Sequence, residues 1–191
     1  EKIGFGLTYR SQVNMSVTNG QATFVVPSSL EANFPNGSFS SSLPLPQVIT
    51  LGFSYKPTDK LSLALDVNYV GWKAYDTLAF DYETNTSSLF DTKSVRSYEN
   101  IFAFRGGANY DFTDKIAARL GIAYGISPVQ NGYVTPETPD ANRINYTAGF
   151  SYKIGKHFAL DASVFFTHLK RTDTNIETNL SGTFTTNVVA P

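Results

Sequence analysis

The sequence predicts an all-β protein, an antiparallel up-and-down β-barrel whose strands cross a membrane. Three observations predict it: stretches in which apolar and polar residues alternate, tight turns that join these stretches in pairs, and aromatic residues that recur at fixed heights. One hairpin pattern occurs three times, with a tyrosine before each turn, at Tyr55, Tyr110 and Tyr152. Hairpins with level aromatics and one apolar side are typical of bacterial transmembrane barrels.

Seven strands are expected along the chain. Proline cannot donate a hydrogen bond to a β-ladder, and all nine prolines lie outside the interiors of the alternating stretches. The expected strands cover residues 2–18, 46–56, 60–75, 96–111, 115–127, 142–153 and 157–170. The connections are expected to be tight turns at residues 57–59, 112–114 and 154–156, and long loops at residues 19–45, 76–95, 128–141 and 171–191. Short turns at one end and long loops at the other are typical of outer-membrane barrels.

The two sides of each strand differ in polarity. From Leu61 to Tyr69 the odd positions are apolar and the even positions are polar or small, and the stretches from Ile116 and Phe158 repeat this pattern. One face is therefore expected to contact lipid and the other to line a wet interior. Six charged residues lie at mid-strand on the polar face: Arg10, Asp66, Arg105, Arg119, Arg143 and Asp161.

A soluble sandwich or lipocalin-like barrel is the alternative fold, since its strands alternate in the same way. Charged residues make up only 16% of the chain and aromatic residues 14%, which indicates a surface that does not face water. No apolar run reaches the roughly 18–20 residues of a membrane helix, so a membrane would be crossed by strands. These features, with the charged inner positions and the aromatics at both ends of the apolar band, favour the membrane barrel.

The composition also excludes several classes of function. A formal net charge of −1 offers no cationic stripe for nucleic acid. The chain has no cysteine, which excludes disulfides and thiol chemistry. There is no nucleophile elbow and no phosphate-binding glycine loop, and His157 and His168 lie too far apart along one strand to share a metal. We therefore expect no enzyme activity, no cofactor and no metal.

Seven strands cannot close an up-and-down barrel, because the first and last strands would meet in parallel. The start, Glu1-Lys2-Ile3, is similar to Asp59-Lys60-Leu61, which follows a turn, so the chain is expected to begin just after a turn. The last residues, 171–191, are expected to form a long loop with no returning strand. We therefore expect part of the barrel to be missing from this chain.

Three groups of residues resemble the outer-membrane long-chain fatty acid and hydrocarbon transporter family (FadL/TodX type). They are Gly6-Leu-Thr-Tyr-Arg-Ser11, the segment from Leu45-Pro-Gln-Val48 to Val70-Gly-Trp72, and Ser127-Pro-Val129 followed by Thr138-Pro-Asp-Ala-Asn-Arg143. Their order and spacing agree with the family along nearly the whole chain. The resemblance implies a 14-stranded barrel with an N-terminal hatch in its lumen. On that template this chain would be the C-terminal portion, without the hatch, the first six strands and the closing strand.

The resemblance further implies diffusion of long-chain fatty acids or similar hydrophobic small molecules across a bacterial outer membrane. The complete barrel would be a monomer surrounded by outer-membrane lipid, and cargo would be captured among the extracellular loops. The matching loop, residues 19–45, is unusually apolar for an exposed loop, which is typical of a binding surface. The candidate capture residues are Phe24, Val25, Val26, Leu30, Phe34, Phe39 and Leu43. They could instead pack against neighbouring loops as a cap.

The inner arginines allow two interpretations. A guanidinium group donates two parallel hydrogen bonds to a carboxylate, so these residues could hold the head group of a fatty acid. Alternatively, they form salt bridges with Asp66 and Asp161. The candidates for either role are Arg10, Arg105, Arg119 and Arg143.

Two further expectations concern the loop side of the barrel. Strict alternation would point Trp72, the only tryptophan, into the lumen, but a bulge at Gly71 could turn it outward, and we expect it to be an anchor at the outer interface. The alternative to a transporter is a structural or adhesive barrel whose long loops bind partners.

Overall fold

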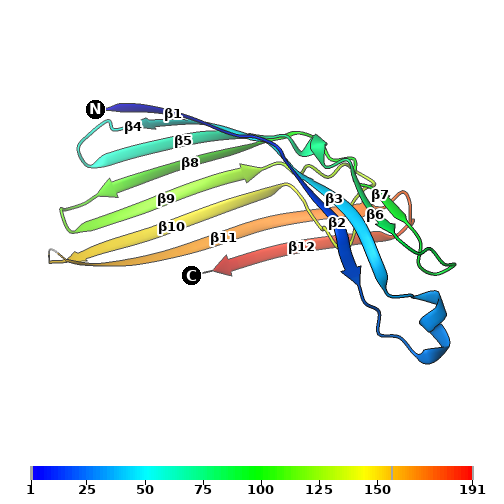
Figure 1. Ribbon diagram of the computed structural model, residues 1–191. Helices are drawn as coiled ribbons and strands as arrows, with labels where there is room; N and C mark the ends of the chain where they lie inside the picture. The colour runs from blue at the N-terminus through cyan, green and yellow to red at the C-terminus, as the bar shows by residue number, and fades with distance from the viewer. Residues whose placement is uncertain (1, 156, 191) are drawn as a thin grey trace.

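The computed structural model describes residues 2–155 and 157–190, and these form an all-β structure (Figure 1). The strands are β1 (Ile3–Arg10), β2 (Val13–Ala22), β3 (Gly37–Leu45), β4 (Val48–Tyr55), β5 (Leu61–Val70), β6 (Thr77–Tyr82), β7 (Thr92–Val95), β8 (Ile101–Asp111), β9 (Ile116–Gly125), β10 (Arg143–Ile154), β11 (Phe158–Thr174) and β12 (Ser181–Ala190). Two short 3-10 helices, η1 (Ser28–Asn33) and η2 (Trp72–Ala74), lie in the connections. Among the described residues, no helix is long and apolar enough to span a membrane.

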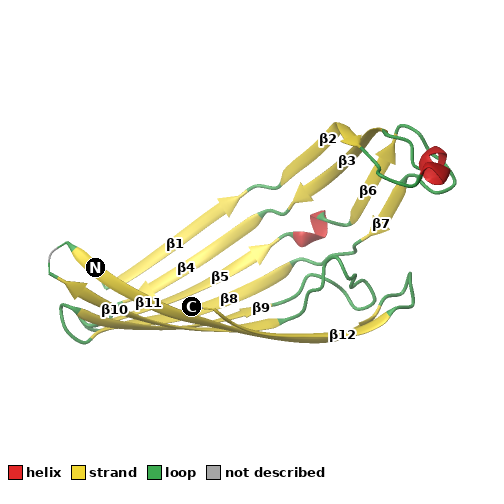
Figure 2. Ribbon diagram, turned by 90° about the horizontal axis from the view of Figure 1, so that it is seen from below, coloured by secondary structure: helices red, strands yellow, loops and turns green. Residues whose placement is uncertain are grey.

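Eight strands form the main sheet, in the order β1-β4-β5-β8-β9-β10-β11-β12. Every neighbouring pair is antiparallel, and the short connections that follow β4, β8 and β10 lie at one end of the sheet (Figure 1). The sheet curves without closing, so β1 and β12 form its two edges (Figure 2). This architecture confirms the predicted fold class, an antiparallel up-and-down barrel wall that is open here.

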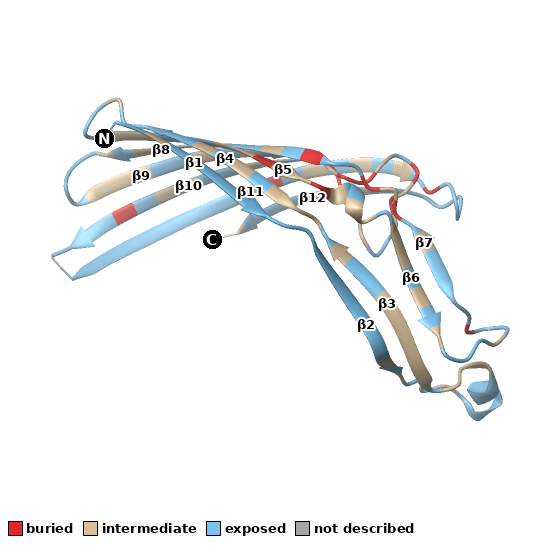
Figure 3. Cartoon of the chain, turned by 45° about the horizontal axis from the view of Figure 1, so that its top comes forward, coloured by how far each residue is buried: buried red, intermediate tan, exposed pale blue. Residues whose placement is uncertain are grey.

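The remaining four strands, in the order β2-β3-β6-β7, form a second sheet that continues the wall above the main sheet (Figure 2). The pairing of β1 with β4 ends at Arg10 opposite Val48, and that of β2 with β3 begins at Val13 opposite Leu45, so one register continues from the main sheet into the second as far as Val17, beyond which it shifts before Gly20. Pro46 lies at the junction, where it has no N–H to donate to a ladder. The second sheet bends away from the main sheet at this point (Figure 3).

The two faces of the main sheet differ as the alternation predicts. The outer face carries large exposed side chains, including Phe5, Leu51, Leu65, Leu120 and Leu160. The inner face carries small and polar residues. No large side chain among the described residues is fully buried, because a single curved sheet has no second layer on which to pack. The buried apolar cluster lies instead at the loop end and joins Tyr98, Val129 and Val134 to the partly buried Trp72, Tyr75, Tyr133 and Phe184.

The prediction of seven strands was wrong in detail. Residues 181–190, expected to be loop, form β12, which pairs with β11 from Phe165 to Thr174 and raises the main sheet to eight strands. The expected strand at residues 2–18 is two strands, β1 and β2, and the expected loops at residues 19–45 and 76–95 contain β3, β6 and β7. The strands β3, β6 and β7 lie beyond the main sheet, and they carry only short apolar alternations, at Leu43 and Leu45 in β3 and at Leu78, Phe80 and Tyr82 in β6. Lys156, in the third expected turn, lies outside the described residues, as do Glu1 and Pro191.

Candidate functional site

The inner face of the main sheet lines a hollow of about 1090 Å³. At its centre small residues of adjacent strands lie side by side. The register joins Ser54 to Ala64, Ala64 to Gly107, and Gly107 to Gly121. These short side chains leave the backbone wall almost bare, so the hollow is wide between the charged residues above and below it.

Two ion pairs cross the inner face at mid-strand. The Arg105 guanidinium lies 3.3 Å from Asp66, whose other neighbour, Asn68, donates a 2.9 Å hydrogen bond to it. Arg119 lies 3.5 Å from Asp161, which also accepts a hydrogen bond from the Ser151 hydroxyl. The register places Arg105 directly opposite Asp66. Arg119 of β9 instead reaches across β10, where it donates a 2.7 Å hydrogen bond to Ser151, the residue directly opposite Asp161.

These ion pairs contribute little to stability, because water reaches them from the open hollow. Water screens exposed ion pairs, and the cost of ordering two long side chains offsets much of their attraction. The pairing does bear on ligand binding, since a carboxylate that entered the hollow would have to compete with Asp66 or Asp161 for its guanidinium group.

The other two predicted inner arginines lie near the loop end. Arg143 begins β10 and pairs at 3.1 Å with Asp140 of the preceding loop. Arg10 ends β1 opposite Val48 and takes part in no ion pair among the described residues. The structure therefore brings together the mid-sheet charges and leaves Arg10 apart from them.

The predicted capture residues do not form one cluster. The Phe24 and Phe34 rings pack at 5.8 Å at the tip of the β2–β3 hairpin. Phe39 lies on β3, where its ring packs 6.0 Å from Phe80 and 6.2 Å from Tyr82.

Glycine makes room for the second aromatic group. A Cβ at Gly20, opposite Phe39 in the β2–β3 ladder, would lie 2.5 Å from the Phe39 ring. The ring therefore lies against the backbone of β2 at Gly20. The alternation of Leu78, Phe80 and Tyr82 in the sequence was the signal for β6 and for this group, and the prediction of a loop at residues 76–95 missed it.

The other candidate capture residues are more open to solvent. Val25 is 98% exposed, and Leu30 and Leu43 are also exposed, whereas Val26 is half-buried. Leu43 lies on β3 opposite Met15 of β2, in an apolar stripe of the second sheet with Val13, Val17 and Leu45. By the continuous register this stripe extends the outer face of β1 and β4.

Trp72 does not anchor the outer interface as we expected. The strand β5 ends at Val70, and η2 turns the chain so that Trp72 packs edge-on against Tyr98, with ring centroids 5.9 Å apart. The indole thus belongs to the buried cluster at the loop end.

A family described as "Outer membrane protein transport protein (OMPP1/FadL/TodX)" matches residues 1–190. The chain belongs to this family. An outer membrane protein of Neisseria meningitidis serogroup B is 31% identical over 139 residues, which are 70% of this chain and 29% of that protein. A long-chain fatty acid transport protein of Escherichia coli O6:H1 is 22% identical over 167 residues, which are 87% of this chain and 36% of that protein.

The fold of a solved family relative agrees with this one. The crystal structure of a Pseudomonas aeruginosa FadL homologue superimposes with a TM-score of 0.76 at 19% identity, covering 98% of this chain and 46% of that one. The chain thus spans less than half the length of these three relatives. Membership in the FadL/TodX family identifies the chain as part of a bacterial outer-membrane protein and confirms the family that the sequence resembles.

Proposed function

We propose that the chain is the C-terminal portion of a monomeric outer-membrane barrel that carries long-chain fatty acids or similar hydrophobic small molecules by facilitated diffusion, without chemical catalysis. Its outer face contacts membrane lipid. The observation that carries the proposal is the apolar and aromatic surface of the β2–β3 hairpin and β6, which stands above a barrel wall with a wide inner hollow. Open apolar surface of this kind is typical of binding sites.

The two aromatic groups have different roles in this proposal. Phe24 and Phe34 pack at the hairpin tip, beside the exposed Val25, and form the first contact for cargo. Phe39, with Phe80 and Tyr82, forms a broader aromatic surface nearer the barrel. Because these contacts are apolar and non-directional, they suit an alkyl chain or an aromatic hydrocarbon.

The inner charged residues bind the cargo after its capture at the hairpin. In the proposed mechanism, Arg105 and Arg119 remain paired with Asp66 and Asp161 and hold the polar parts of the wall in place, and they exchange their partners for a carboxylate head group when one enters. Arg143 pairs with a loop aspartate, and Arg10 lies nearest the hairpin. Small residues between the charges leave space for the alkyl chain.

Binding of a fluorescent fatty acid to the full-length protein in detergent tests the proposal. Saturable binding is expected, and Phe34→Ala and Phe39→Ala should each weaken it several-fold. Phe112→Ala is the matched control, because Phe112 is 53% exposed but lies in the turn at the opposite end of the barrel. Absence of saturable binding by the intact protein would refute the transport proposal.

The adhesive barrel is the second candidate, and the projecting second sheet favours it, since β2, β3, β6 and β7 extend well beyond the end of the main sheet (Figure 3). The same experiment separates the two. An adhesin has no reason to bind a fatty acid saturably or to lose that binding with Phe39.

A further inference from the structure

The β9–β10 connection, residues 126–142, folds across the inner side of the sheet. We name this segment the mouth loop. It contacts β11 and β12 on one side and the connections after β5 and before β8 on the other. The strands β8, β9 and β10 lie between these two sets of contacts in the sheet order.

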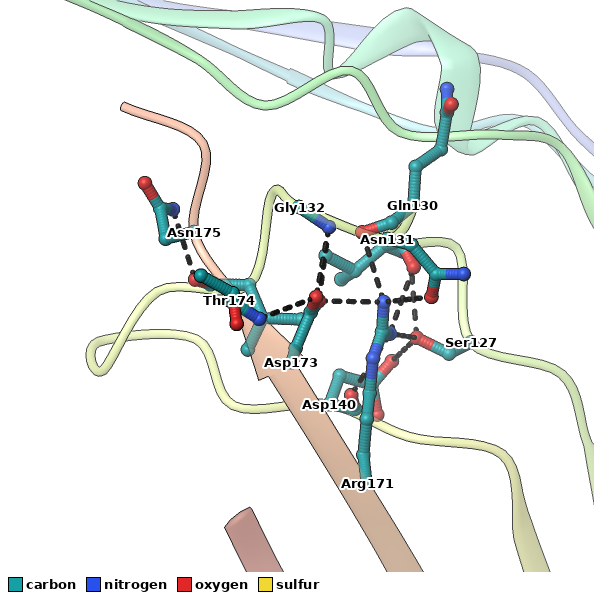
Figure 4. A network of polar contacts seen from close by, with 11 residues as sticks. Ser127, Gln130, Asn131, Gly132, Asp140, Arg171, Asp173, Thr174 and Asn175 are labelled. Carbon is teal, nitrogen blue, oxygen red and sulfur yellow. Dashed lines mark hydrogen bonds and ion pairs between the residues drawn. The ribbon is translucent and has the colours of Figure 1, made fainter. Parts of the chain in front are cut away.

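Arg171 of β11 holds one side of the mouth loop (Figure 4). Its guanidinium group donates to the carbonyl oxygens of Val129 at 2.8 Å, Gln130 at 2.9 Å and Asp140 at 3.2 Å. It also donates to the side chains of Ser127, Asn131 and Asp173. A planar group with several fixed donors suits this set of acceptors, whereas the ammonium group of lysine does not.

Asp173 completes this attachment. Its side chain is only 10% exposed and lies 3.1 Å from the Arg171 guanidinium, which is 12% exposed. Its carboxylate also accepts a 3.0 Å hydrogen bond from the backbone N–H of Gly132 in the mouth loop. Loss of Arg171 would leave this buried carboxylate without its cation and the loop carbonyls without donors.

The other side of the mouth loop is attached to the connection between β7 and β8. Val129 pairs with Tyr98 in a β-bridge, and the N–H of Glu99 donates to Pro128 at 2.8 Å. The buried Arg96 donates to Thr135 at 3.1 Å and to Glu137 at 3.2 Å.

The direction of the β11 side chains places the mouth loop inside the barrel. Asp161, Ser163 and Phe165 of β11 line the hollow. Alternation along the unbroken strand gives Arg171 and Asp173 the same face. A loop that touches these side chains and also Tyr98 crosses the inner side of the sheet at its loop end.

We propose that the mouth loop is a fixed strap that closes the loop-side mouth of the hollow over β8–β12 to water-borne solutes, and that Arg171 is the residue that positions it. The strap leaves the β2–β3 hairpin open, so cargo captured there enters along the wall and not through the axial mouth. This route rests on the proposed transport function, whereas the barrier to water-borne solutes does not.

The test uses the absence of cysteine from this chain. Ser163→Cys, on the inner face below the strap, is introduced into an otherwise cysteine-free full-length protein in lipid vesicles and labelled from outside with a membrane-impermeant maleimide. Adding Arg171→Ala should raise the labelling rate several-fold, and Arg171→Lys should give an intermediate rate. Val25→Cys, at a 98% exposed position, should label equally in all backgrounds.

Gly132→Val displaces the strap without touching Arg171, in case the arginine variant fails to fold. Gly132 has φ +89°, and a Cβ there would lie 2.6 Å from Ile176, so this variant should also raise the labelling rate of the Ser163→Cys protein. Gly182→Val is its matched control, because the space around Gly182 is open. Equal labelling in folded Arg171→Ala, Gly132→Val and parent proteins would overturn the strap. Loss of fatty-acid binding by the parent would overturn only the transport proposal.

Discussion

Leu120→Lys tests whether the outer face of the sheet contacts lipid. Leu120 is 67% exposed and is the central one of the five outward residues of β9, from Ile116 to Tyr124. It therefore lies near the middle of the apolar band. A lysine or arginine on the lipid face at the bilayer midplane costs about 2–4 kcal/mol, which is about a thirtyfold to several hundredfold change in the unfolding equilibrium.

The matched controls are Ala117→Lys and Ala123→Lys, which lie three residues below and above Leu120 on the inner face of the same strand. Their lysines face the wet hollow and should cost far less. Guanidinium denaturation of the full-length protein in lipid vesicles measures the three free energies of unfolding. If Leu120→Lys costs no more than the two controls, the outer face does not contact lipid and the assignment of the faces is refuted.

Two further predictions concern the loop side. Gly20→Val should push the Phe39 ring from its place, weaken fatty-acid binding and cost about 1–3 kcal/mol in stability, whereas Gly6→Val, with nothing within 4 Å of its Cβ, should do neither. The pKa of Glu137 lies below its ordinary value of 4.5, chiefly because the Thr135 hydroxyl donates to its carboxylate and then because of Arg96. The stability from this group is present above pH 4.5 and is lost as the pH falls through the lower folded pKa. The effect should be small, since the side chain is 72% exposed, and Glu137→Gln should remove it from a plot of denaturation midpoint against pH.

The sequence predicted the strands whose outer face is apolar along its whole length. In β5 and β9 every outward residue must be apolar or aromatic, or small, so the period of two is plain in the sequence. Above the apolar band water contacts both faces, and β12, which is rich in threonine, carries no such period. The strand was therefore missed, and with it the even number of strands in the main sheet.

The candidate site was predictable to the same extent. Alternation placed Asp66 and Arg105 on one face, and pairing between adjacent strands then brought them together. Arg171 was missed because it falls in a stretch expected to be loop and because three of its acceptors are backbone carbonyls. Any residue can supply a carbonyl, so such a site leaves no motif in the sequence.

The register that continues from the main sheet into the second sheet as far as Val17 limits how the height of this wall can change. Deleting one residue between Arg10 and Val13 would move Val13, Met15 and Val17 to the serine side of the second sheet and turn the apolar stripe inward. A compensating deletion between Leu45 and Val48 would restore the pairing but not the face. Below Val17, length changes in homologous barrels are therefore expected in steps of two residues on each of the paired strands, unless an irregularity such as the one between Val17 and Gly20 absorbs the odd residue. The same rule applies to protein engineers who wish to lengthen or shorten the wall below the hairpin.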